Sequence, residues 1–89
     1  MGKPCIYVLI WTDEAITKVA RHGLTIKDVK EAMVWDPRKK AVWQEDYEHG
    51  RRLEVRGKSD GNNRDIIAYL DPVDPRDGVW RVRTAWPIE

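Results

Sequence analysis

The chain has 89 residues, enough for one small domain with a single modest hydrophobic core. Its 16 basic and 15 acidic residues leave a formal net charge of +1, so overall charge gives no argument for nucleic-acid binding. Cys5 is the only cysteine, which excludes an intrachain disulfide and a cysteine-based zinc site and is typical of a reducing cytoplasm.

The apolar segment 5–11 is too short to cross a membrane, and a secretory signal would need a longer apolar region followed by a cleavage site. We therefore expect one domain over residues 1–89, located in the cytoplasm and without a membrane partner.

The N-terminal half predicts a strand followed by two helices. Residues 5–11 are β-branched, aromatic and unbroken, which is typical of a strand that is apolar on both sides. Thr12 or Asp13 is suited to cap a first helix, and Gly23 is suited to end it. The expected inward stripe of this helix consists of Ala15, Ile16, Val19 and Ala20.

A second helix is expected to start at Thr25, because Asp28 follows three residues later in a weak form of the capping box. It should stop at Asp36, since the residue before a proline is pushed out of the helical region. His22, between the helices, has two interpretations: a helix C-terminal cation next to a glycine, or a ligand for a substrate phosphate.

The second half changes to a period of two, which predicts four strands. They are expected at 40–45, 51–58, 64–71 and 79–86, with turns or loops at 46–50, 59–63 and 71–78. The order β-α-α-β-β-β-β predicts an α+β fold with two layers. Its sheet should be largely antiparallel, with both helices packed on one face.

The last predicted strand has one apolar and one basic side. Trp80, Val82, Thr84 and Trp86 alternate with Val79, Arg81, Arg83 and Ala85. The segment 52–56 repeats this pattern, with Arg52, Glu54 and Arg56 on one side. We therefore expect arginines on an exposed sheet face that meets a phosphate-bearing partner. The alternative is that alternating Arg and Glu simply solvate the outer face of the sheet.

Several short motifs resemble the BrnT-type toxins of the RelE/ParE superfold, which are ribonuclease toxins of type II toxin–antitoxin systems. The matching segments are Trp11-x-Asp13-Glu14-Ala15, Arg21-His22-Gly23, Val29 through Asp36-Pro37, and His49-Gly50-x-Arg52. The resemblance implies a RelE/ParE-like fold, a basic sheet face that cuts mRNA, and an antitoxin protein that covers this face. A homodimer and a toxin–antitoxin hetero-oligomer both remain open.

The final strand departs from the family pattern, which has the form Arg-Ile-Ile-Ser-Ala-Arg. Arg81 is retained, Arg83 is additional, and Trp86 replaces the last arginine. This departure concerns catalysis more than the fold. Trp86 is also the tryptophan that we expect to meet a partner.

Cleavage of RNA through its own 2′-hydroxyl needs a base, cations for the developing phosphorane charge and an in-line geometry. Guanidinium groups suit bidentate phosphate binding. The candidate catalytic arginines are Arg52, Arg64, Arg81 and Arg83. Tyr69 or His49 is the candidate for proton transfer or base stacking. Two histidines without a suitably spaced third ligand give no metal site, and we expect no cofactor.

Two hypotheses follow. The first is a toxin-like endoribonuclease that cleaves mRNA by metal-free 2′-OH transesterification. The second is a non-catalytic RNA- or protein-binding module of the same fold, which has lost the catalytic arginine at position 86.

Overall fold

The structure is a computed structural model, and it describes residues 4–48, 50–61 and 63–88. Two helices, α1 (Asp13–Arg21) and α2 (Ile26–Lys30), follow the first strand, β1 (Val8–Ile10), and a π-helical segment, η1 (Glu31–Trp35), continues α2. Four strands complete the chain: β2 (Lys40–Asp46), β3 (Gly50–Ser59), β4 (Arg64–Asp74) and β5 (Val79–Pro87). The predicted α+β class and the predicted element order are confirmed.

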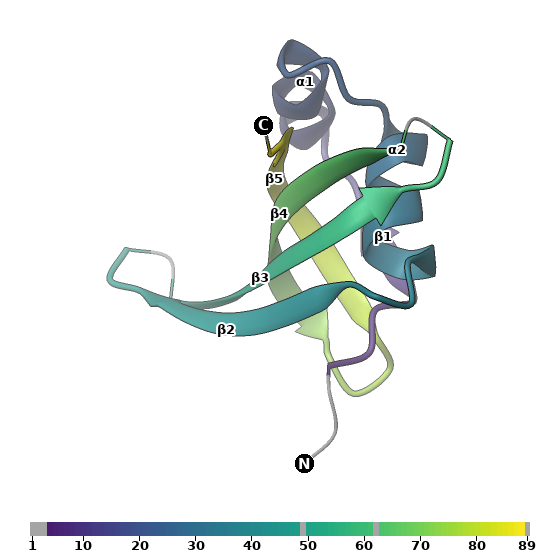
Figure 1. Cartoon of the computed structure of the whole chain (residues 1–89). Helices are drawn as coiled ribbons and strands as arrows, with labels where there is room; N and C mark the ends of the chain where they lie inside the picture. The colour runs from purple at the N-terminus through teal and green to yellow at the C-terminus, as the bar shows by residue number, and fades with distance from the viewer. Residues whose placement is uncertain (1–3, 49, 62, 89) are drawn as a thin grey trace.

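The described strands form one five-stranded sheet in the order β1-β5-β4-β3-β2 (Figure 1). The hairpin-connected strands β2 to β5 pair antiparallel, and β1 is added to β5 in parallel, so the sheet is mixed. The central strand is β4, and Ile66, Ile67, Ala68 and Leu70 are all buried there. The continuous apolar run in the sequence of β4 is typical of a central strand.

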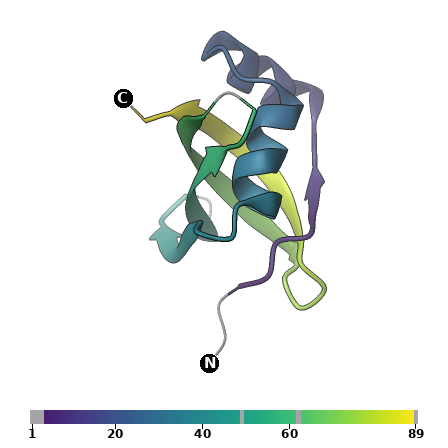
Figure 2. The same cartoon turned by 45° about the vertical axis from the view of Figure 1, so that its right-hand side comes forward.

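The helices and η1 cover one face of this sheet (Figure 2). Both helices begin at the predicted caps: the Thr12 hydroxyl accepts the N–H of Ala15, and Thr25 and Asp28 form a complete capping box. At the C-terminal end of α1, Gly23 has a φ of +77°, a conformation in which glycine has no Cβ penalty. The caps therefore set where the two helices begin and where α1 ends.

The inward stripe of α1 is narrower than its sequence predicted. Ala15 and Val19 are buried, whereas Ile16 is 37% exposed and Ala20 also faces solvent. The prediction for Ile16 and Ala20 was wrong because α1 packs on β5 near the edge of the sheet, where few neighbouring elements cover it.

Close packing of η1 on β3 depends on Gly57. A Cβ at this position would lie inside van der Waals contact with the backbone carbonyl of Ala32. The approach buries Ala32, Met33 and Val55 completely between the two layers. On the other side of the core, the fully buried Trp80 donates its indole N–H to the Cys5 carbonyl at 2.7 Å and lies 5.5 Å from the Trp43 ring.

Two strand predictions are corrected by the structure. The first strand covers only residues 8–10, and Val8 is 49% and Ile10 39% exposed, because β1 is an edge strand and not a buried central one. The strand β4 also runs on to Asp74, past the predicted end at Asp71, since Pro72 is accommodated beside a register irregularity between Pro72 and Asp74.

A second register shift, between Tyr69 and Leu70, changes which side chains of β5 face the helices. Leu70 pairs with Val82 and Tyr69 pairs with Thr84, so Arg83 is the extra residue of a bulge. Ala85 is therefore buried, and Thr84 and Trp86 join the face away from the helices. The predicted single alternation over 79–86 was wrong at Thr84, Ala85 and Trp86, because a bulge reverses the side of every later residue.

Within the described ranges, no helix is long and apolar enough to cross a membrane.

Candidate functional site

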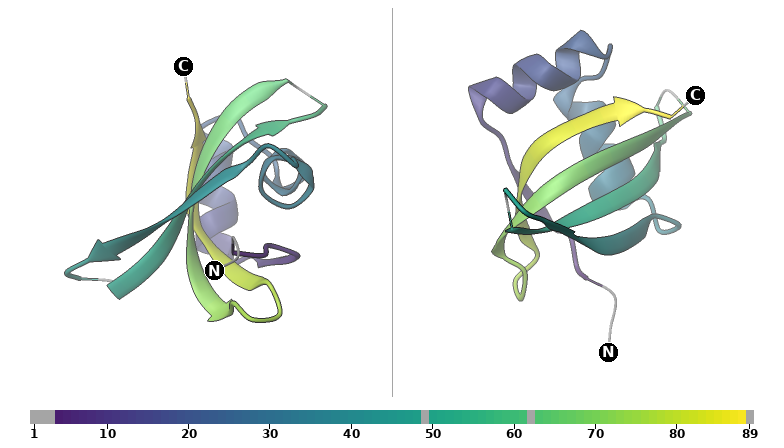
Figure 3. Two further views of the ribbon diagram at one scale, coloured as in Figure 1. Left: turned by 60° about the horizontal axis from the view of Figure 1, so that its bottom comes forward. Right: turned by 90° about the vertical axis from the view of Figure 1, so that its left-hand side faces the viewer.

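The face of the sheet opposite the helices, called the open face here, carries most of the predicted site residues. Figure 3 (right) shows it in front of α1 and α2. Cross-strand pairing places Glu54, Tyr69 and Thr84 in one row, and Arg56, Ile67 and Trp86 in the next. Arg81 lies on the same face, opposite Asp71. Arg52 shares the parity of Glu54 on β3, so Arg52 and Arg81 are on the same side of the sheet.

A hydrogen-bonded pair forms the centre of the open face. The Tyr69 hydroxyl donates to Glu54 Oε1 at 2.7 Å, and the guanidinium carbon of Arg52 lies 4.4 Å from the centroid of the Tyr69 ring. Arg56 Nε is 4.0 Å from Glu54 Oε2. The Glu54 side chain is only 17% exposed, so its charge is held next to cations in a partly desolvated position.

This arrangement alters the acidity of the phenol. The hydrogen bond to Glu54 and partial burial raise the pKa of Tyr69 above its ordinary value of 10.0, although Arg52 and Arg56 act in the opposite direction. Tyr69 therefore stays protonated at neutral pH, and its one O–H is donated to Glu54. It is not suited to act as a base.

The two arginines of β5 differ in their surroundings. Arg83 Nε donates to Asp71 Oδ2 at 3.1 Å and to Oδ1 at 3.3 Å, and both side chains are less than a third exposed. Arg81 is exposed and makes no side-chain hydrogen bond or ion pair with any residue that the structure describes. Arg81 is thus available to a ligand, whereas Arg83 already has an anionic partner.

Arg64 is not brought into this group. Arg64 lies at the start of β4 with the parity of the inward residues, and its Nη1 donates to the Gly23 carbonyl at 3.3 Å. Arg64 thus lies apart from Arg52 and Arg81, next to the loop after α1 on the helix side, and its role as a phosphate ligand stays a prediction. His49 lies outside the described residues.

Two members of the open face, Glu54 and Arg56, were not predicted as site residues, and a third, Trp86, was expected to meet a partner but was assigned to the other side of its strand. Glu54 was considered only as a pairing partner for arginine, and Arg56 was not singled out for catalysis. The periodicity of 52–56 was sufficient to find Glu54 and Arg56, since both share the parity of Arg52. The side of the sheet on which Trp86 lies could not be predicted from the alternation, because nothing in the segment 79–86 marks the bulge at Arg83.

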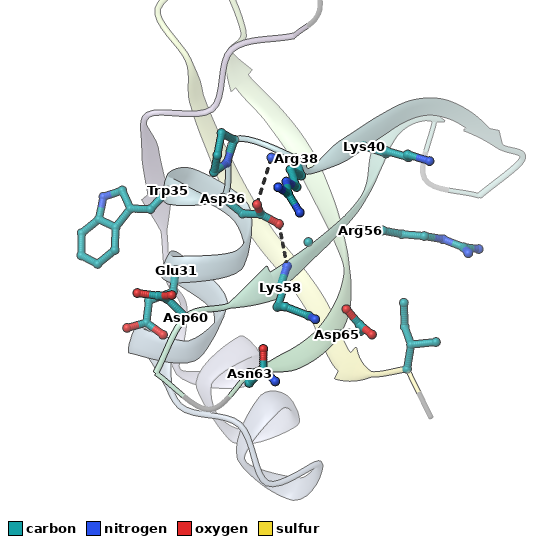
Figure 4. A pocket seen from close by; sticks show the side chains of 13 residues that line it. Glu31, Trp35, Asp36, Arg38, Lys40, Arg56, Lys58, Asp60, Asn63 and Asp65 are labelled. Atoms are coloured by element: carbon teal, nitrogen blue, oxygen red, sulfur yellow. Dashed lines mark hydrogen bonds between the residues drawn. The ribbon is translucent and has the colours of Figure 1, made fainter.

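A groove of about 810 Å³ lies beside the part of β3 that follows Arg56 and has no pairing with β2 (Figure 4). Arg38, Lys40 and Arg56 lie toward one end, and Glu31 and Asp60 toward the other. Asp36 Oδ2 accepts the N–H of Lys58 at 2.8 Å and Oδ1 accepts that of Arg38 at 2.9 Å. Glu31 Oε1 accepts the N–H of Gly61 at 2.9 Å. Two of the acidic side chains of the groove are thus engaged by backbone groups.

The part of the chain that the structure describes contains no group of three or more His, Cys, Asp or Glu side chains placed to hold a metal ion. Comparison of the chain with protein-family models, with curated proteins and with solved structures gives no significant match.

Proposed function

We propose that this protein is a toxin-like endoribonuclease of the cytoplasm, which binds single-stranded RNA on the open face and cleaves it through the 2′-hydroxyl. The observation that supports this most is the grouping of Arg52, Arg56 and Arg81 on one uncovered sheet face around the Glu54–Tyr69 pair. The likeness of the sequence motifs to BrnT-type toxins points to the same activity and to an antitoxin protein as its partner.

The proposed reaction assigns one role to each group. Glu54 accepts the proton of the 2′-hydroxyl, whose oxygen then attacks the adjacent phosphorus while the bond from phosphorus to the 5′-oxygen breaks. The products are a 2′,3′-cyclic phosphate and a 5′-hydroxyl: water supplies the proton of the leaving oxygen, and the hydroxide that this leaves takes the proton from Glu54. Arg52, Arg56 and Arg81 stabilise the negative charge that develops on the phosphorane oxygens.

Tyr69 acts in this scheme as a positioning residue. Its hydrogen bond fixes the orientation of the Glu54 carboxylate, and its ring holds the Arg52 guanidinium by a cation–π contact. Arg83 stabilises the phosphorane charge less than Arg81 does, because its guanidinium already forms an ion pair with Asp71.

The test is cleavage of a defined single-stranded RNA by the purified protein in the presence of EDTA. Arg52→Ala, Arg81→Ala and Glu54→Gln should each lower the rate about 10²-fold or more, as expected for loss of a group that stabilises the transition state. Lys27→Ala is the matched control, since it removes one exposed charge from α2 on the covered side of the sheet. Absence of cleavage at every protein concentration, or activity that survives all three changes, would contradict the proposal.

The second candidate is a binding module of the same fold without cleavage. The Asp71–Arg83 ion pair favours it, because it neutralises an arginine that phosphate chemistry could have used. Under this reading, RNA binds to the open face, the three variants weaken binding, and no cyclic phosphate is formed. Overexpression in a bacterium separates the two candidates: the nuclease should arrest growth, and the binding module should leave it unchanged.

A further inference from the structure

A line of π-systems crosses the open face from β3 to the end of α1. The Arg52 guanidinium covers the Tyr69 ring at 4.4 Å, Tyr69 lies 5.5 Å from Trp86 with an interplanar angle of 37°, and Trp86 lies 6.3 Å from the ring of His22 at 48°. The four residues come from three strands and from the C-cap of α1. The proposed reaction uses only the first two of them.

The second half of this line is the part that a ligand can reach. Arg52 covers a face of Tyr69 and Glu54 holds its hydroxyl, so Tyr69 is already engaged. Trp86 is partly exposed and His22 is exposed. The bulge at Arg83 places Trp86 on this side of the sheet, where an indole that only filled the core would not lie.

The surroundings of Trp86 indicate which occupant it suits. Arg56 lies in the same cross-strand row, two strands away from Trp86, so their Cα atoms are about 10 Å apart. Aromatic rings interleaved with cations are the arrangement with which proteins hold single-stranded nucleic acid: the bases stack and the phosphates are neutralised. A purely apolar partner would leave these cations desolvated without a counter-charge.

We propose that Trp86 and His22 form a base-stacking subsite for single-stranded RNA, which holds a nucleotide next to the one cleaved at Glu54. This inference rests on the proposed function, in that it extends the RNA path from the same centre. Because base stacking accepts every base, the subsite adds affinity and fixes the register of the strand without specifying its sequence.

Binding is measured separately from cleavage with a fluorescein-labelled 2′-O-methyl hexanucleotide, which lacks the attacking hydroxyl, and with an abasic hexamer that has the same number of phosphates. Fluorescence anisotropy gives both affinities. Trp86→Leu should weaken binding of the base-bearing strand roughly tenfold and leave the abasic strand unchanged, and Trp86→Phe should keep most of the affinity. Trp35→Leu, at an exposed tryptophan on η1, is the matched control and should change neither affinity.

Three results would overturn the subsite: equal affinities of the wild-type protein for the two strands, base-dependent binding that survives Trp86→Leu, or an equal loss for both strands. If Trp86→Leu does not fold, as judged by its thermal transition, His22→Ala carries the test and should cause a smaller loss confined to the base-bearing strand. Base-dependent binding without any cleavage would end the nuclease proposal and leave the subsite standing. Cleavage whose rate is unchanged in Trp86→Leu would end the subsite proposal and leave the nuclease proposal standing.

Discussion

The hydroxyl of Tyr69 lies 2.7 Å from Oε1 of Glu54, its direct cross-strand partner in the sheet. The contact joins the central strand β4 to β3 on the side away from the helices. Because the carboxylate accepts this bond and lies next to Arg56, the open face has an ordered acidic group among its cations.

The raised pKa of Tyr69 predicts a specific alkaline behaviour. The folded state holds the phenolic proton more tightly than the unfolded chain, whose tyrosine pKa is 10.0, so the stabilisation is fully present below pH 10. It is lost as the pH rises through the folded pKa. Tyr69→Phe should therefore show a weaker fall in stability above pH 10 than the wild type, measured by denaturant unfolding across this range. Tyr7, whose pKa is also raised, is present in both proteins and cancels in the comparison. Parallel pH profiles would contradict the assignment.

The ion pair between Arg83 and Asp71 predicts a gain of function. Asp71→Asn should release Arg83 and raise affinity for a non-cleavable RNA strand roughly two- to tenfold at low salt, because one repulsive charge disappears and one cation becomes available. Glu14→Gln removes a negative charge from α1 and is the control. Unchanged or lower affinity for Asp71→Asn in the anisotropy measurement would show that Arg83 does not face the RNA.

Gly57 is predicted to be the least replaceable glycine among those described. A methyl group here would collide with the Ala32 backbone, so Gly57→Ala should lower the free energy of unfolding by about 1–3 kcal/mol or more. At Gly61 the added Cβ meets only the end of the Glu31 side chain, at 3.2 Å. Gly61→Ala should therefore cost clearly less in the same chemical denaturation experiment, and equal losses would show that η1 can move away from β3.

Asp36 is expected to stabilise the part of β3 that β2 does not cover. Its carboxylate accepts the N–H groups of Arg38 and Lys58, and the latter lies beyond Arg56, the last residue of β3 that pairs with β2. Asp36→Ala should cost about 1–2 kcal/mol of stability and speed hydrogen exchange at the Lys58 amide. Asp60→Ala, in the neighbouring loop, is the control. Unchanged exchange at Lys58 would contradict this role.

Local rules predicted the helices well, because their ends are set by neighbouring residues. Thr25 and Asp28 form the expected capping box, and Gly23 takes the left-handed conformation that ends α1. The extent to which each side chain is buried was harder to predict. Ile16 and Val8 are apolar in the sequence yet exposed, because α1 and β1 lie at the border of the sheet and the sequence does not state which strand occupies an edge.

The same distinction applies to the site. The alternation of side chains along β3 correctly predicted that Arg52 and Leu53 lie on opposite faces, since this strand pairs without interruption over its central residues. On β5 the bulge at Arg83 reversed the later residues, so Trp86 was assigned to the wrong side. Arg64 was grouped with the other arginines by residue type alone, and its position at the inward start of β4 directs it to Gly23. Residue type is therefore insufficient where the pairing register is unknown.

The central claim is that the arginines of the open face hold the phosphates of an RNA strand, and the salt dependence of binding tests it most directly. With Arg52, Arg56 and Arg81 each engaging one phosphate, a plot of log affinity against log salt for a non-cleavable single strand should have a slope of about −2. Arg81→Ala should reduce its magnitude by about 0.7, while Lys27→Ala should leave it unchanged. A flat plot, or a slope that none of the three arginine variants alters, would contradict the account.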